Sequence, residues 1–154
     1  NTRLAKLDAG EYDAIILACA GLDRLGLGAR IRSRLAAPAW LPAAAQGAIA
    51  VELRAGDART AALIAPLHDV ATARCTGAER AMTRRLQGNC EVPIAAWCVE
   101  TEHGLQLHGL VGDAASGQLI RAAAATAFDA EPEALGREVA EELLALGAGA
   151  LLKA

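Results

Sequence analysis

The sequence predicts an α/β segment followed by a smaller α+β domain, in which helices pack on a three-stranded antiparallel sheet. The first indication is the run 13–20, which is apolar without alternation, as in a strand covered on both faces of a parallel sheet. The second is a set of three strand-like segments separated by turn residues, namely 94–100, 105–111 and 118–124. The change from α/β to α+β organisation falls near residue 67.

Before that point, helices and strands alternate. Residues 2–9 predict a short helix, and residues 46–53 predict a second apolar strand. Asp57 is a suitable N-cap for a helix over 58–65. The proline- and tryptophan-containing stretch 36–42 interrupts this order and predicts a hinge or crossover between lobes, because proline breaks regular structure.

Two longer helices are predicted on either side of the three strands. The first begins at about Asp69, a favourable cap, and runs to about Gln87. The second covers about 131–146, with Pro132 in its first turn and Gly147 at its end. Its apolar stripe, which we expect to pack on one face of the meander, consists of Leu135, Val139, Leu143 and Leu146.

Composition excludes several classes of partner. With 154 residues, the chain can bury about 70% of its unfolded surface. Hydrophobic residues make up 54% but aromatic residues only 3%, so the core must be built from Ala, Leu, Ile and Val. A net charge of −3 gives no general attraction to nucleic acid or to an anionic membrane. Any anionic ligand must therefore be held by local arginines.

No apolar run approaches the roughly 18 residues that a membrane span needs. The chain begins at Asn1 without an initiator methionine or a recognisable targeting segment, which indicates a processed protein or a piece of a longer one. The four cysteines form no C-x-x-C pair, and the three histidines lack zinc-site spacing, so we expect no metal. Scattered cysteines are typical of a reducing, cytoplasmic setting.

A strand–glycine–helix turn follows the first apolar run. Gly21 and Arg24 lie within the stretch 21–26, directly after the predicted strand. Ligands of open α/β sheets bind at such strand ends, and a glycine with a nearby arginine suits a carboxylate. The same pattern also fits an ordinary solvated helix arginine. The alternating arginines of 30–34 are interpreted as a solvated segment.

The stretch 88–94 places Cys90 at a turn between a helix and a strand. A helix C-terminus carries partial negative charge, which opposes thiolate formation, so the position does not suit an activated nucleophile. It suits either an ordinary loop cysteine or a thiol alkylated once and left as a stable thioether. A thiol hydrolase is a third interpretation, disfavoured because nothing places an imidazole beside Cys90.

Taken together, these stretches resemble the porphobilinogen deaminase (hydroxymethylbilane synthase) family. The resemblance extends over nearly the whole chain, and its segments occur in the family's order. Two departures are Asn89 and Ala45, where family members commonly have glycine. The matching segments are 2–4, 10–18, 21–26, 41–43, 46–48, 79–82, Leu86, Gly88 and 90–94.

The resemblance implies the C-terminal half of an enzyme whose first two domains are periplasmic-binding-protein-like α/β lobes. Residues 1–43 would end the second domain, 44–67 would be a return strand and helix of the first, and 68–154 would form the third, cofactor-carrying domain. The implied activity is the deaminating condensation of four porphobilinogens onto a cysteine-held dipyrromethane, followed by hydrolysis to hydroxymethylbilane. The full enzyme would be a cytoplasmic monomer of tetrapyrrole and heme biosynthesis.

The same resemblance assigns roles to individual residues. Cys90 matches the covalent attachment point of the dipyrromethane cofactor. The other implied cofactor- or substrate-binding residues are Arg3, Gly21, Arg24 and Gln46. The catalytic aspartate belongs to the missing N-terminal half, so we expect no catalytic residue here and no activity from this chain alone. The competing hypothesis is a non-catalytic small-molecule-binding lobe of solute-binding or sensor type, which leaves Cys90 without a role.

Overall fold

The computed structural model describes residues 2–87 and 93–152. These residues form two compact units, Asn1–Leu35 and Ala36–Ala154, which are described separately below.

The first unit contains two short helices and a 3-10 turn. Helix α1 spans Thr2–Asp8, α2 spans Cys19–Arg24 and the 3-10 helix η1 spans Gly28–Arg30. The strand predicted over 13–20 is wrong: residues 13–18 have no regular structure, and Cys19 already belongs to α2. A strand exists only through hydrogen bonds to neighbouring strands, and none pairs with this segment among the described residues.

The second unit begins with a long irregular segment. The strand predicted over 46–53 does not form among the described residues, where Ile49 is 93% exposed. The capped helix that follows is confirmed as α3, Ala58–Ile64, where the Asp57 carboxylate accepts a hydrogen bond from the Thr60 backbone N–H at 3.0 Å. A 3-10 turn, η2, continues it over Ala65–Leu67.

Helix α4, Val70–Arg85, confirms the long helix predicted before the strands. Asp69 caps it by accepting a hydrogen bond from the Thr72 backbone N–H at 2.7 Å. Gln87 adopts a left-handed φ of 55° just beyond its end. Gly88, which we expected to close the helix, lies outside the described residues.

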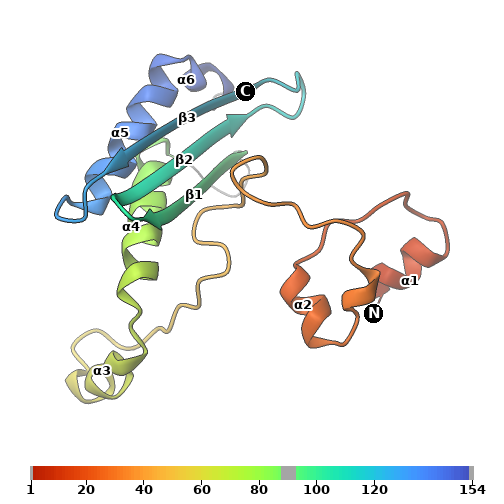
Figure 1. Cartoon of the computed structure of the whole chain (residues 1–154), viewed down its shortest axis with the longest axis horizontal. Helices are drawn as coiled ribbons and strands as arrows, with labels where there is room; N and C mark the ends of the chain where they lie inside the picture. Colours follow the sequence, from red (N-terminus) through yellow and green to blue (C-terminus); the bar gives the residue numbers. More distant parts are fainter. Residues whose placement is uncertain (1, 88–92, 153–154) are drawn as a thin grey trace. The chain divides into compact units, whose positions relative to one another are not determined.

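The predicted antiparallel meander is confirmed. Strands β1 (Ile94–Thr101), β2 (Gly104–Gly112) and β3 (Leu119–Thr126) form one sheet in the order β1-β2-β3. The register pairs Ala96 with Gly109 and Gly109 with Ala122. Figure 1 shows that β2 occupies the middle, which leaves one edge of β1 open to other parts of the chain.

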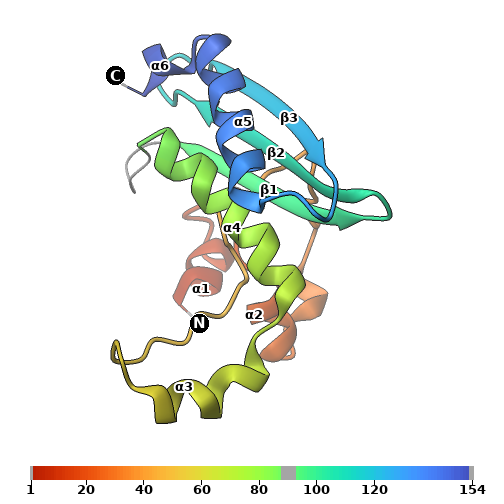
Figure 2. The same cartoon turned by 90° about the vertical axis from the view of Figure 1, so that its left-hand side faces the viewer.

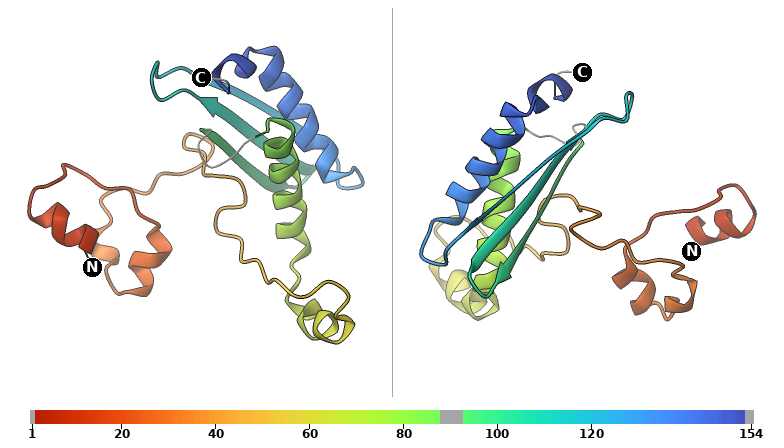
Figure 3. Two further views of the ribbon diagram at one scale, coloured as in Figure 1. Left: turned by 180° about the vertical axis from the view of Figure 1, so that it is seen from behind. Right: turned by 45° about the horizontal axis from the view of Figure 1, so that its top comes forward.

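Helices α4 and α5 (Pro132–Ala145) cover one face of this sheet, and the short α6 (Ala148–Leu151) follows α5 (Figures 2 and 3). The core lies between these helices and the sheet. Its largest fully buried side chains are Met82, Leu105, Leu107, Val111, Leu135, Val139 and Leu143. Among the described residues, no helix is both long enough and apolar enough to cross a membrane.

One member of the predicted α5 stripe does not pack. Leu146 is 56% exposed, because α5 ends at Ala145 and Gly147 turns the chain with a left-handed φ of 99°. Ala148 of α6 is fully buried and joins the core in place of Leu146.

Helices α4 and α5 pack so closely that the contact requires glycine. A Cβ atom added to Gly136 of α5 would lie 2.2 Å from the Ala78 carbonyl oxygen and 2.8 Å from the Ala81 Cβ, both on α4. Gly109 of β2 is similar, since an added Cβ would lie 2.6 Å from the Met82 sulfur. Any side chain at these positions would force backbone or core atoms apart.

Candidate functional site

Three of the predicted binding residues lie in the first unit. Arg3 is on α1, while Gly21 and Arg24 are on α2, and all three are exposed. Among the described residues, the guanidinium groups of Arg3 and Arg24 take part in no ion pair. They are therefore available to an anionic ligand, to which a guanidinium can donate paired hydrogen bonds.

The neighbouring arginines are used within the unit instead. Arg30 pairs with Asp8 at 2.5 Å, and Arg34 pairs with Asp23 at 3.1 Å. The segment 30–34 is mostly exposed, as predicted, but two of its arginines are neutralised by carboxylates. This contrast distinguishes Arg3 and Arg24 from Arg30 and Arg34, whereas Arg32, like Arg3 and Arg24, is exposed and takes part in no ion pair among the described residues.

The fourth predicted residue, Gln46, lies in the second unit within a turn over residues 44–47. Its backbone N–H donates to the Ala43 carbonyl oxygen at 3.1 Å, and its side chain is exposed. Ala45, just before it, has a left-handed φ of 60°. Gln46 belongs to a different unit from Arg3, Gly21 and Arg24, and Cys90 lies outside the described residues.

The turn carrying Gln46 is fixed to the open edge of β1 at two points. The Ala96 backbone N–H donates to the Pro42 carbonyl oxygen at 2.9 Å. The Glu79 carboxylate accepts from the Ala45 backbone N–H at 2.6 Å and from the Cys98 backbone N–H at 2.7 Å. A single side chain of α4 thus joins the turn to the strand that begins four residues after Cys90 in sequence.

Among the described residues, Glu79 is the one buried charged residue of the core, and it is 6% exposed. Burial raises the pKa of this carboxyl group, and the two backbone hydrogen bonds oppose that rise without cancelling it. Sequence reasoning did not assign it a role. The available signal was a glutamate on the same helix face as Ala78 and Met82, where an apolar residue is normal.

Among the described residues, nothing in the surroundings of Cys75, Cys98, His103 and His108 indicates a catalytic role. Burial raises the pKa of both Cys75 and Cys98, which leaves these thiols protonated and unreactive. His103 lies 3.3 Å from Glu102 in the β1–β2 turn, and the His108 ring lies 5.5 Å from that of Trp97. Within 2–87 and 93–152, no group of side chains could hold a metal ion.

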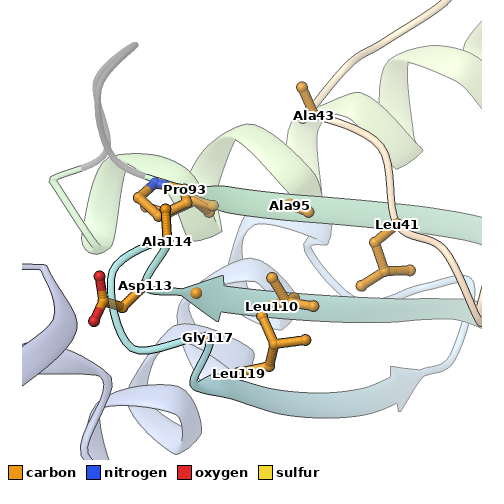
Figure 4. Close-up of a pocket in the computed structure, with 11 residues that line it drawn as sticks. Leu41, Ala43, Pro93, Ala95, Leu110, Asp113, Ala114, Gly117 and Leu119 are labelled. Atoms are coloured by element: carbon orange, nitrogen blue, oxygen red, sulfur yellow. The ribbon is translucent and has the colours of Figure 1, made fainter. Parts of the chain in front are cut away.

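A groove of about 490 Å³ lies at the end of the sheet where β1 begins and β2 ends (Figure 4). Its walls are mostly apolar. Leu110 and Ala95, which are cross-strand partners, lie on the face of the sheet away from α4 and α5, and Leu41 covers them. The complete lining is Leu41, Ala43, Pro93, Ile94, Ala95, Leu110, Gly112, Asp113, Ala114, Gly117 and Leu119.

The single carboxylate of this groove serves its own loop. Asp113 accepts hydrogen bonds from the backbone N–H groups of Ala115 and Ser116, each at 3.0 Å, and from the Ser116 hydroxyl. The Ser116 hydroxyl and then these backbone groups hold the Asp113 pKa below its ordinary value. The groove therefore offers apolar contact rather than acid–base chemistry. Pro93, three residues after Cys90, forms part of its rim.

Comparison with known proteins decides the family. The family model described as "Porphobilinogen deaminase, dipyromethane cofactor binding domain" matches residues 1–62, and "Porphobilinogen deaminase, C-terminal domain" matches residues 73–145. The chain belongs to the porphobilinogen deaminase family.

Individual porphobilinogen deaminases match over the whole chain. The protein from Stenotrophomonas maltophilia (strain K279a) is 58% identical over 152 residues, which are 99% of this chain and 50% of that protein. The protein from Xylella fastidiosa (strain M23) is 55% identical over 154 residues, which are 100% of this chain and 50% of that protein. The chain thus spans about half the length of the curated relatives it matches.

One of the two departures from the resemblance falls at an unusual backbone position. Ala45, where the resemblance implies glycine, has a left-handed φ of 60°. Glycine adopts that conformation freely, whereas an L side chain makes it less favourable by about 1–2 kcal/mol. Ala45 adopts this conformation here, and the hydrogen bond from its backbone N–H to Glu79 helps to hold it. Asn89, the other departure, lies outside the described residues.

Proposed function

We propose that this chain is the C-terminal half of a hydroxymethylbilane synthase, a transferase of tetrapyrrole and heme biosynthesis. The observation that carries the proposal is the match to both porphobilinogen deaminase models in chain order, together with 58% identity over 152 residues. The enzyme would act as a cytoplasmic monomer. Its partners are porphobilinogen, the growing pyrrole chain and the N-terminal half of the same polypeptide.

The reaction is the stepwise addition of four porphobilinogens, each losing ammonia as a new carbon–carbon bond forms. The dipyrromethane, when bound, supplies the free pyrrole end to which the first substrate is added. Hydrolysis then releases hydroxymethylbilane and leaves the cofactor on the protein. This chemistry requires an anchor that is not cleaved, cations for the many carboxylates, and an acid that the proposal assigns to the N-terminal half.

Cys90 is the proposed anchor. A thioether is stable to the hydrolysis that releases the product, so the same cysteine holds the cofactor through many turnovers. Two of the other thiols suit this role poorly, because Cys98 is buried and burial raises the pKa of both Cys75 and Cys98. The groove whose rim includes Pro93 offers an apolar surface three residues after Cys90 in the sequence.

Arg3, Gly21, Arg24 and Gln46 are the proposed binding residues for cofactor and substrate. The exposed guanidinium groups of Arg3 and Arg24, which pair with no carboxylate among the described residues, fit the acetate and propionate side chains of these pyrroles. Gly21 leaves space on α2 three residues before Arg24, since an added Cβ would meet nothing within 4 Å. Gln46 supplies an exposed amide that can both donate and accept.

The proposed domain organisation follows the resemblance. Residues 1–43 complete a second α/β domain, 44–67 return to the first, and 68–154 form the third; the first two are periplasmic-binding-protein-like lobes. Exposure supports the return segment: Ile49, Val51 and Leu53 recur at every second position and are 93%, 54% and 36% exposed. We propose that the segment carrying this apolar face forms a strand that pairs with a strand of the N-terminal half.

The first experiment is the denatured intact mass of the full-length polypeptide and of its Cys90→Ser variant. The parent is expected to exceed its sequence mass by one dipyrromethane, and the variant to match its sequence mass and form no bilane. A suitable control is Cys19→Ser, since Cys19 is partly exposed on α2 and has no proposed role. This control should retain the added mass.

A parent without added mass, purified from cells that make porphobilinogen, would make Cys90 an ordinary loop cysteine. The non-catalytic binding-lobe hypothesis would then lead. Added mass retained in Cys90→Ser would place the attachment at another residue.

The arginine assignment predicts a separate effect. Arg24→Gln in the full-length polypeptide should reduce kcat/KM for porphobilinogen at least tenfold, because a charge-assisted hydrogen bond contributes about 1.5–3 kcal/mol. Steady-state kinetics of bilane formation measures this. Arg32→Gln, an exposed arginine of the same unit, is the matched control and should stay close to the parent. Equal kinetics for both variants would remove Arg24 from the site.

A further inference from the structure

Glu79 has no role in the function proposed above, although its environment is specific. The residue is 6% exposed, and each carboxylate oxygen accepts from a different backbone N–H group. Oε2 accepts from Ala45 at 2.6 Å, and Oε1 accepts from Cys98 at 2.7 Å. Both distances are at the short end for hydrogen bonds to a charged acceptor.

The site requires two acceptor atoms on one side chain. An ionised carboxylate supplies them, whereas an amide of the same shape supplies one oxygen and one NH₂ group, which would face an N–H donor. Burying a charge is unfavourable unless it is hydrogen-bonded, and an apolar side chain would fill the same volume without that cost. The position is therefore specific for a carboxylate and not only for a side chain of this size.

The two acceptors join segments that are distant in the sequence. Ala45 and Gln46 belong to the turn over 44–47, and Cys98 belongs to the open edge of β1. The Pro42 carbonyl, which accepts from Ala96 at 2.9 Å, fixes the start of the turn, and Glu79 fixes its centre. Gln46, the next residue, projects from a backbone held in a left-handed conformation at Ala45.

We propose that Glu79 is a positioning residue that holds the turn over 44–47 on β1 and so orients the Gln46 amide toward the dipyrromethane and the growing pyrrole chain. This inference rests on the proposed function, because Gln46 has a role only if that function is correct. Glu79 itself touches neither cofactor nor substrate and acts through the backbone of the turn.

The test uses the full-length polypeptide with Glu79→Gln, and Glu138→Gln on the exposed side of α5 as the matched control. Hydrogen exchange of a peptide covering residues 43–48 should accelerate about tenfold or more in Glu79→Gln, since a charged hydrogen bond is lost. A peptide from α5 should exchange as in the parent. The control should change neither peptide.

A double-mutant cycle then tests whether Glu79 acts through Gln46. Glu79→Gln and Gln46→Ala should each lower kcat for bilane formation. The double variant should be no slower than Gln46→Ala alone, because Glu79 is proposed to act only through Gln46. Losses that multiply independently would overturn the proposal, as would a Glu79→Gln variant whose 43–48 peptide exchanges at the parent rate.

The Ala45→Gly substitution tests the role of Glu79 through the rate of bilane formation, which it should not restore if Glu79 is purely structural. Glycine favours the left-handed conformation without help from Glu79, so Ala45→Gly should restore part of the rate lost in Glu79→Gln. No recovery would contradict the proposal. If Glu79→Gln does not accumulate as folded protein, Glu79→Asp replaces it, since its shorter side chain keeps the charge but should still release the turn.

The outcomes separate this inference from the function on which it rests. A parent without added mass and without bilane formation overturns the proposed function. A parent that carries the added mass, together with an unchanged 43–48 peptide in Glu79→Gln, overturns only the role of Glu79.

Discussion

Replacing Gly136 by alanine is expected to destabilise the α4–α5 layer by about 3 kcal/mol or more, at the upper end for overpacked cores. The added Cβ would lie 2.2 Å from the Ala78 carbonyl oxygen and 2.9 Å from the Met82 backbone nitrogen. These are backbone atoms, so the helices must separate. That movement would loosen the contacts of Leu135 and Val139 with the rest of the core. The gain in helix propensity from Gly to Ala, about 1 kcal/mol, is too small to compensate.

The measurement is hydrogen exchange of α4 and α5 peptides in the full-length polypeptide, with denaturant titration of the same samples. Gly149→Ala is the matched control, because its Cβ would meet only the Leu144 side chain, at an ordinary 3.7 Å. That variant should be neutral or slightly stabilised. Protection of α4 and α5 equal to the parent in Gly136→Ala would show that the helices can separate at little cost.

The chain alone is expected to form no hydroxymethylbilane from porphobilinogen. The proposed function places the catalytic acid in the half that this chain does not contain, and it assigns no such role to Asp8, Asp13 or Asp23. The full-length polypeptide is the positive control for the bilane assay. Measurable product from the isolated chain would contradict both the prediction and the assignment of the acid.

An inactive chain is informative only if it is folded. Exchange protection of α4, α5 and β2 in the isolated chain would show that the sheet and its helical layer have formed. Extending the chain with the N-terminal half should then give activity, and the extension should also protect the apolar segment containing Ile49 and Val51. Activity without that protection would overturn the proposed return strand.

Much of the second unit could be predicted because its signals are local. Asp57 and Asp69 each precede an apolar helical pattern and accept from the backbone N–H three residues later, as N-caps do. Turn residues separate the three strands. Each strand pairs with the next one in the sequence, so its partner is nearby. The family resemblance was equally local, since it rested on short ordered motifs.

The strands predicted over the apolar runs 13–20 and 46–53 do not form, because strand formation depends on partners that are not local in sequence. Apolar residues make a segment suitable for a sheet, but hydrogen bonds to a neighbouring strand make it one. Among the described residues no such neighbour is present, and Ile16 and Ile49 are 68% and 93% exposed. The sequence pattern therefore indicated that these segments can form strands, but the described residues contain no strand with which they pair.

The sequence by itself determined the two long helices of the second unit, the meander, the family and the residues proposed to bind cofactor and substrate. Tertiary structure alone decided which side chains are buried and which backbone groups they meet. Glu79 is the clearest case: its partners, Ala45 and Cys98, lie 34 and 19 residues away, and no local period connects the three. A buried carboxylate must find its donors wherever the fold brings them, so only the assembled structure could reveal its role.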